Sequence, residues 1–314
     1  MQLRMEEIKR GRCYAQIRRM TSTATRRHIT PRDVDILTAL DRTPLTVEQL
    51  LKLSQTFEHE PFYSIRSVQD RLNKLRQAGW LNSWPYARAA RGTPPDYYKL
   101  TAEGYRILHG PESPAVGKRH FTENSVAHHH HTHALAEVLV HFHVAAHRAG
   151  TRVVNFYREN SLAIEAAGET LYPDGAFELQ TPDGRQFNFV IELDNSTETV
   201  RSPKEIESWQ RKIRIYHAKQ DEILPNRFRV LVITTRSSLR LRHILSLSAI
   251  LSPDKRRTLF YGVDQSSLLA CSDPVYGPCL IDHNGRPVPL VAAPNTIVMP
   301  VKSRETLATP ASVC

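Results

Sequence analysis

Three carboxylates stand close together on two short stretches whose residues alternate between apolar and polar types. Asp174 lies within LYPDGAFELQ, and Glu192 and Asp194 lie within QFNFVIELDN. Alternation with a period of two is typical of β-strands, because successive side chains point to opposite faces of a sheet. The intervening TPDGR is a tight-turn signal, so the strands are predicted to form an antiparallel hairpin. Such pairing would gather the three carboxylates on one surface.

Carboxylates held together in this way need a compensating partner. Two of them about 4 Å apart repel each other by roughly 4 kcal/mol at an effective dielectric constant of about 20. A fold that holds three together must protonate one, pair them with cations or bind a metal. Oxygen ligands suit Mg²⁺ or Mn²⁺, which would acidify a water, orient it on a scissile phosphate and neutralise the developing charge. A bound Mg²⁺ or Mn²⁺ is therefore one of three ways in which the fold could hold these acids together.

The elements predicted around these acids follow the order helix, three strands, helix, strand. A helical pattern runs over 128–150, a strand follows over 151–157, and the acidic hairpin supplies two more strands. A helix over 199–220 begins at Ser202, followed by proline and by a capping-box glutamate. The continuous apolar run over 227–235 is typical of a fully buried strand.

This order of elements resembles the PD-(D/E)XK nuclease fold. Asp174, after a proline, opens the second strand, and Glu192 falls on the third, where the family places its (D/E)xK motif. One position departs from that pattern, because Asp194 stands where lysine is expected. Some members of the superfamily supply the lysine from the following helix, and Lys212, at the border of that helix's buried stripe, is the best candidate here. Weaker alternatives on the same helix are Lys204 and Lys219.

The resemblance implies a set of catalytic residues and an overlapping set of metal ligands. Glu137, on the first helix, would complete the metal shell as a helical acid does in some relatives, and Glu159 is a weaker alternative. The implied catalytic residues are Asp174, Glu192, Asp194 and Lys212, and the implied ligands of Mg²⁺ or Mn²⁺ are Asp174, Glu192, Asp194 and Glu137.

The first half of the chain predicts three short helices, over 29–40, 46–53 and 64–79, and then a hairpin over 80–100. This order matches a winged helix-turn-helix, in which the third helix enters the major groove and the hairpin flanks the phosphates. The residues expected to contact double-stranded DNA are Arg66, Arg71, Lys74 and Arg76 on the third helix and Arg88 and Arg91 in the hairpin loop. A small helical module with solvated arginines, or a protein-binding adaptor, would give a similar pattern.

Composition favours an anionic partner. The chain of 314 residues has a formal net charge of +10 and a pI near 9.6, which points to nucleic acid before membrane. Its start lacks the apolar core of a signal peptide, and no run approaches the roughly 20 apolar residues needed to cross a bilayer. Four widely spaced cysteines without a CxxC pair suggest a reduced, cytoplasmic protein. Monomer and homodimer both remain open.

The winged helix joined to this PDG…ExD…K…Y arrangement resembles the replication-relaxation family of plasmids and other mobile elements, over approximately Thr30–Val263. The resemblance implies a DNA-acting protein of plasmid replication, mobilisation or transfer, working with plasmid replication or transfer proteins. The expected fold class is a two-domain chain that mixes α+β and α/β architecture. Its expected segments are a basic arm over 1–29, a winged helix over 30–110, a linker over 111–126, a nuclease-like domain over 127–270 and a partly disordered extension over 271–314.

Other interpretations compete with a nuclease. The acids could form a solvated strand end, and a degenerate nuclease fold could serve a non-catalytic replication or mobilisation factor. A transcription regulator with a ligand-sensing domain is a third class, although no pocket signature supports it. His129 and His133 in the run HHHHTH, and also His143 and His147, have i, i+4 spacing, but nothing nearby supplies a third zinc ligand set. No GxSxG, Walker loop or dinucleotide fingerprint occurs.

Overall fold

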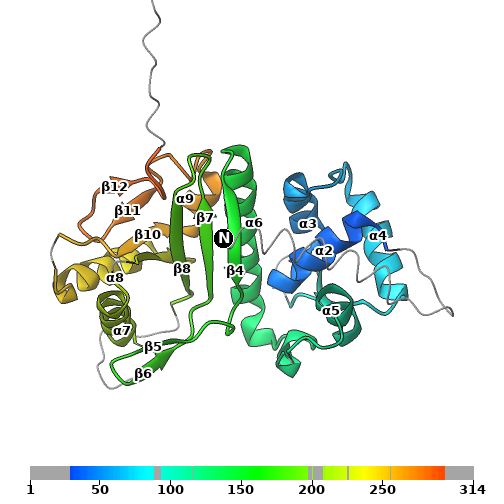
Figure 1. Ribbon diagram of the computed structural model, residues 1–314, viewed down its shortest axis with the longest axis horizontal. Helices are drawn as coiled ribbons and strands as arrows, with labels where there is room; N and C mark the ends of the chain where they lie inside the picture. Colours follow the sequence, from blue (N-terminus) through cyan, green and yellow to red (C-terminus); the bar gives the residue numbers. More distant parts are fainter. Residues whose placement is uncertain are drawn as a thin grey trace, which may run out of the picture.

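The protein, described here from a computed structural model, is a mixed α+β molecule with two lobes (Figure 1). One lobe is mainly helical, the other surrounds a large mixed sheet, and α6 (His129–Arg148) stands between them. Predictions for Arg88, Arg91, Lys204 and the helix start at Ser202 lie outside the described residues. The structure describes residues 29–87, 93–114, 116–196, 200, 208–224, 226–254 and 256–293.

The first lobe combines short helices with a small antiparallel sheet of strand order β1-β3-β2. The helices expected over 29–40 and 46–53 are present, and the side chains of Thr30 and Thr46 cap them through capping boxes. The elements are α2 (Pro31–Arg42), β1 (Leu45–Thr46), α3 (Val47–Leu53), η1 (Ser54–Thr56), α4 (Ile65–Gln77), β2 (Leu81–Pro85), β3 (Asp96–Leu100) and α5 (Ala102–His109). Two single turns, η2 (Lys118–His120) and η3 (Val126–His128), lead into α6.

The second lobe is built on a seven-stranded sheet of order β12-β11-β10-β9-β8-β7-β4. Strands β8, β9 and β10 are mutually parallel, whereas β4, β7 and β8 pair antiparallel. The predicted acidic hairpin is confirmed, with a turn closed by a hydrogen bond from Thr181 N–H to Arg185 O of 3.0 Å. Its strands are β4 (Arg152–Tyr157), β7 (Gly175–Gln180), β8 (Gln186–Asp194), β9 (Phe228–Thr234), β10 (Phe260–Asp264), β11 (Leu280–Asp282) and β12 (Pro287–Val288).

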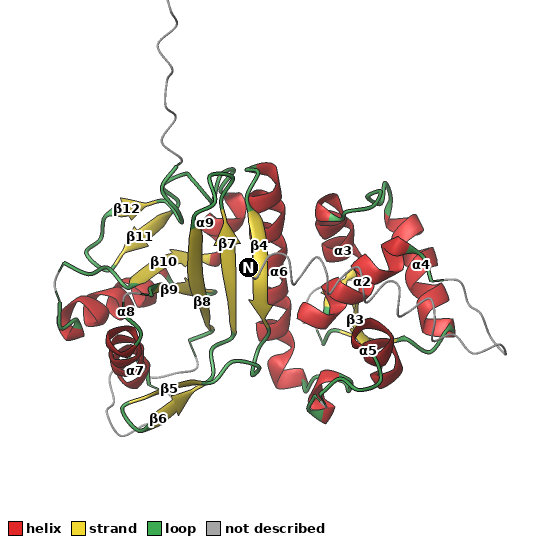
Figure 2. Cartoon of the chain, in the orientation of Figure 1, coloured by secondary structure: helices red, strands yellow, loops and turns green. Residues whose placement is uncertain are grey.

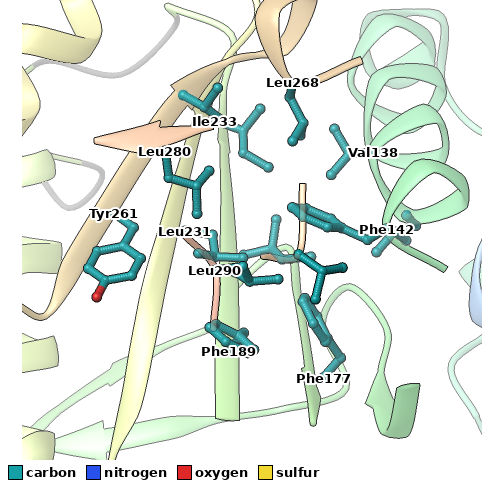
Figure 3. Close-up of a cluster of buried hydrophobic side chains, with 14 of the residues drawn as sticks. Val138, Phe142, Phe177, Phe189, Leu231, Ile233, Tyr261, Leu268, Leu280 and Leu290 are labelled. Atoms are coloured by element: carbon teal, nitrogen blue, oxygen red, sulfur yellow. The ribbon is translucent and has the colours of Figure 1, made fainter. Parts of the chain in front are cut away.

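Helices cover both faces of this sheet (Figure 2). On one face, α6 and α9 pack over the cluster in Figure 3, where Val138 of α6 lies near Leu268 of α9 and Phe142 of α6 packs against Phe177 of the sheet. The other face packs against α7 and α8. The remaining elements are α7 (Trp209–Glu222), α8 (Ser238–Leu251), α9 (Gln265–Ala270) and the separate hairpin β5 (Ile164–Ala166) and β6 (Glu169–Leu171).

The two lobes share α6 and an ionic contact. Ala136 and Val140 of α6 belong to the core cluster of the first lobe. Asp41 of α2 accepts a hydrogen bond of 2.8 Å from Arg158 of the second lobe and also contacts His109 and His120. These partners hold the pKa of the Asp41 carboxyl far below its usual value against the opposing effect of burial.

The segment after α9 belongs to the second lobe. Val275, Leu280 and Leu290 are buried in the same cluster as α6, because β11 and β12 extend the sheet. Cys271 and Cys279 form a disulfide, so the expectation of reduced cysteines is wrong for this pair. Among the described helices, none combines the length and apolar character that a bilayer crossing requires.

Candidate active site

A lysine, a tyrosine and a glutamate meet on the face of the sheet beneath α7. Lys212 Nζ donates a hydrogen bond of 2.7 Å to Glu192 Oε2, and Tyr216 Oη donates to Glu192 Oε1. Lys212 and Tyr216 are four residues apart and therefore lie on one side of the helix. The structure thus brings Lys212 from the helix to the strand glutamate, the contact that the sequence interpretation requires.

Burial changes the proton affinity of this glutamate. Glu192 is 1% exposed, and its removal from water raises its pKa to about 7. The negative charge of Asp174 adds to the rise, whereas the Lys212 ammonium opposes it. A carboxyl group with a pKa near neutrality can take up or release a proton at physiological pH.

Asp174 occupies the position immediately before β7. Its N–H donates to Ile191 O at 3.1 Å, and its Oδ2 accepts from Leu193 N–H at 2.6 Å. Its Oδ1 lies 3.1 Å from Nε2 of His131 on α6. The pKa of Asp174 is lowered despite burial, because the charges of His131 and Lys212 favour the carboxylate.

His131 is a site residue that sequence reasoning missed, although the histidine run contains it. Its Nδ1 lies 2.9 Å from Asn195 Nδ2, beyond the end of β8. Burial opposes the charged ring, but the neighbouring Asp174 carboxylate raises the pKa of His131 above its usual value. One candidate ligand atom from each of His131, Glu159 and Asp174 lies within 4.8 Å of the others. The weaker alternative ligand, Glu159, therefore belongs to this group.

The neighbouring histidine His129 has a structural role. Its Nδ1 accepts a hydrogen bond of 2.8 Å from Ala87 N–H, and its Nε2 lies 3.1 Å from Asn124 O. The His133 ring packs edge-on against Tyr86. The i, i+4 pair of histidines at the start of α6 therefore holds this helix to the first lobe, whereas His131 faces Asp174.

Asp194 does not fit the predicted role of metal ligand. Its Oδ1 accepts hydrogen bonds from Trp209 Nε1 at 3.0 Å and Arg240 Nη2 at 2.7 Å. Its Oδ2 accepts from Arg240 Nε at 2.5 Å and from Ser196 N–H at 3.2 Å. Both oxygens are therefore committed to a buried ion pair between the sheet and α8, which gives Asp194 a structural role.

Glu137 is also misplaced in the sequence interpretation. It accepts a hydrogen bond of 2.8 Å from Gln49 Nε2 and lies 3.9 Å from Lys52 Nζ, both on α3 of the first lobe. It stands six residues after His131 on α6, which is roughly 240° around a helix of about 3.6 residues per turn. Glu137 therefore points away from the acids.

The predicted DNA-contacting residues of α4 divide into exposed and internal side chains. The Arg66 side chain is 88% exposed, and Lys74 and Arg76 are exposed as well. Arg71 instead makes a bidentate ion pair with the buried Asp33 carboxylate at the start of α2. Because this pair holds two helices together, the structure gives Arg71 an internal role rather than the predicted DNA contact.

Comparison with known proteins gives one match. Neither the curated proteins nor the solved structures gave a match to this chain. The family model described as replication-relaxation matches residues 37–221, from α2 to α7, a span that includes Asp174, Glu192, Lys212 and Tyr216. That span is more than half of the 314 residues. The chain therefore belongs to the replication-relaxation family.

Proposed function

We propose that this protein acts on DNA in the replication or mobilisation of a plasmid or other mobile element, as a metal-dependent endonuclease. In this proposal the first lobe is a winged helix-turn-helix that grips duplex DNA, and the second is a PD-(D/E)XK-like domain that nicks or cleaves nearby. The observation that carries the proposal is the Lys212 ammonium on Glu192, beside Asp174 at the end of β8. Family membership supports the biological setting.

Each residue of the site has a chemical task in this proposal. Lys212, only 12% exposed, would place a fixed positive charge where negative charge develops on the phosphate. Glu192, with a pKa of about 7, would accept a proton from the attacking water. Tyr216 holds the second Glu192 oxygen and so fixes the direction of the carboxylate.

The site also fits a divalent cation. His131 Nε2 is buried without a hydrogen-bond partner among the described residues, and it faces a carboxylate oxygen of Asp174. Asp174 Oδ1 is the oxygen donor that Mg²⁺ or Mn²⁺ would take first, since both Glu192 oxygens are paired with Lys212 and Tyr216. When bound, such a cation would supply Lewis acidity toward the phosphodiester and the attacking water.

A non-catalytic function is the alternative, and one observation favours it. Both oxygens of Glu192 are already paired, one with Lys212 and one with Tyr216. A network closed in this way is stable without a cation, as in a domain that retains a nuclease-like fold only to bind DNA or partner proteins. The absence of the motif lysine from β8, where Asp194 stands instead, also favours a non-catalytic function.

Removal of the metal tests the choice between these functions. We expect the full-length protein to convert supercoiled plasmid to the open circle with Mg²⁺ or Mn²⁺, and excess chelator to slow this conversion at least about 100-fold. The measurement is the fraction of nicked plasmid over time on agarose gels. Inactivity with either metal, while the protein still retards duplex DNA, would favour the accessory factor.

Exposed cations on α4 should set the salt dependence of DNA binding. We expect Arg66→Ala and Lys74→Ala each to weaken duplex affinity and to lower the slope of log K against log salt by about one. Arg256→Ala is the matched control, since this exposed arginine lies on the other lobe. Fluorescence anisotropy at several salt concentrations gives the slopes. Equal slopes for all three variants and the wild type would remove α4 from the DNA interface.

A further inference from the structure

Three side chains from separate elements converge beside the Lys212 network. His131 comes from α6, Glu159 from the turn after β4, and Asp174 from the residue before β7. Their candidate ligand atoms all lie within 4.8 Å of one another. One ion could therefore contact all three after small side-chain adjustments, because metal–ligand distances in proteins are about 2 Å.

The ring nitrogen of His131 that faces this point has no hydrogen bond. Nε2 is buried and lies 3.1 Å from Asp174 Oδ1, yet the geometry of a hydrogen bond is not met. Buried polar nitrogens almost always have a partner, and an exception calls for a ligand or ion. The Asp174 carboxylate therefore calls for a positive centre at this nitrogen, supplied by the ring proton or by a cation that takes its place.

The orientation of the ring is fixed from its other side. His131 Nδ1 contacts the Asn195 side chain at 2.9 Å, and Asn195 is itself held by Thr235 Oγ1 at 2.8 Å. Metal-binding histidines typically bind the metal through one ring nitrogen and donate the N–H of the other to an outer partner. Here the Asn195 amide nitrogen faces Nδ1, so the ring proton of neutral His131 lies on Nε2. A cation at Nε2 would take the place of that proton and would require the Asn195 amide to turn its oxygen toward Nδ1–H.

Asp174 is arranged in the same manner. Its Oδ2 is taken by Leu193 N–H at 2.6 Å, which leaves Oδ1 directed at His131. Glu159 completes the group from a turn in which Ser161 Oγ donates to Arg158 O at 2.6 Å.

We propose that His131, Glu159 and Asp174 form a divalent-cation site of one nitrogen and two oxygen donors, which selects Mn²⁺ over Mg²⁺. An imidazole ligand favours first-row transition metals, whereas Mg²⁺ prefers oxygen ligands and retained waters. The inference rests on the proposed function for the use of the ion in hydrolysis. It places His131 and Glu159, with Asp174, where the resemblance implied Glu192, Asp194 and Glu137 as further ligands.

Metal binding to the full-length protein without DNA tests this site directly. Calorimetric titration should give one Mn²⁺ per chain, bound at least about tenfold more tightly than Mg²⁺. His131→Asn should weaken Mn²⁺ binding about tenfold or more and leave Mg²⁺ binding within about threefold. Glu159→Gln should weaken both. The matched controls are His130→Asn and Glu165→Gln, two exposed neighbours that should bind Mn²⁺ like the wild type.

A spectroscopic readout separates direct ligation from an indirect effect. The electron spin echo of bound Mn²⁺ should carry the nitrogen modulation of a coordinated imidazole in the wild type and in Glu159→Gln. That modulation should vanish in His131→Asn. If His131→Asn loses its native circular dichroism, the altered Mn²⁺ affinity of Glu159→Gln, a substitution on a surface turn, still decides.

The outcomes also separate this inference from the endonuclease proposal. Mn²⁺ affinity and nitrogen modulation that are unchanged by His131→Asn would overturn the site, even if the protein nicks DNA. Absence of saturable Mn²⁺ binding at millimolar concentrations would overturn it as well. Binding that depends on His131, in a protein that never nicks plasmid, would support the site and remove the endonuclease.

Discussion

Asp174→Asn is expected to lower the rate of plasmid nicking at least about 1000-fold, which corresponds to about 4 kcal/mol of transition-state stabilisation. The Asp174 carboxylate lies 3.1 Å from the His131 ring and also attracts the Lys212 ammonium, so its charge lowers the cost of holding positive charge at the site. Asparagine removes this charge but keeps an oxygen that can accept the hydrogen bond from Leu193 N–H. The loss would therefore report chemistry rather than unfolding.

The measurement is the first-order conversion of supercoiled plasmid with enzyme in excess, alongside duplex affinity from anisotropy. Asp183→Asn is the matched control, because Asp183 lies in the turn at the other end of the same hairpin. We expect this control to nick at the wild-type rate and both variants to bind DNA normally. Nicking by Asp174→Asn at the wild-type rate would assign the activity to another site or to a contaminant.

The meeting of Lys212 with Glu192 could be predicted from the sequence. Trp209, Ile213 and Tyr216 recur at helical spacing and are buried, so Lys212, next to Ile213, lies at the edge of the stripe that faces the sheet. The turn signal between the acidic strands fixed their pairing, and alternation then placed Glu192 on the α7 side. Local periodicity gives these two positions, whereas the expectation that a lysine of the following helix meets the strand glutamate comes from the resemblance to PD-(D/E)XK nucleases.

The choice of Glu137 over His131 failed because α6 is buried on two sides. Leu135 and Phe142 pack in the second lobe, and Ala136 and Val140 pack in the first. A helix between two cores has no single polar face, so its hydrophobic pattern cannot tell which polar residue faces the sheet. Only the positions of both lobes around α6 show that His131, and not Glu137, lies near Asp174.

The roles of Asp194 and Arg71 depend on partners far along the chain. Arg240 lies 46 residues after Asp194, and Asp33 lies 38 residues before Arg71. Alternation correctly places Asp194 on the same face as Glu192. It cannot show that Arg240 of α8 pairs with Asp194 whereas Lys212 of α7 pairs with Glu192. Ion pairs between distant elements are properties of packing, and local spacing does not encode them.

Arg240→Met is expected to destabilise the second lobe by about 3–5 kcal/mol, because it leaves a buried carboxylate without its cation. The Asp194 side chain is 0% exposed, and Arg240 binds both of its oxygens. The indole N–H of Trp209 and the N–H of Ser196 would remain, but neither carries a charge. Such a loss is a large part of the roughly 5–15 kcal/mol that stabilises a typical domain.

Adding Asp194→Asn to Arg240→Met should recover much of this loss, since it removes the charge that the first substitution isolates. Arg242→Met is the matched control, because Arg242 is exposed on the same helix, and it should change stability by less than about 0.5 kcal/mol. Urea unfolding followed by circular dichroism gives the four free energies of the double-mutant cycle. A cost below about 1 kcal/mol for Arg240→Met, or no recovery in the double variant, would contradict a buried pair and return Asp194 to the possible metal ligands.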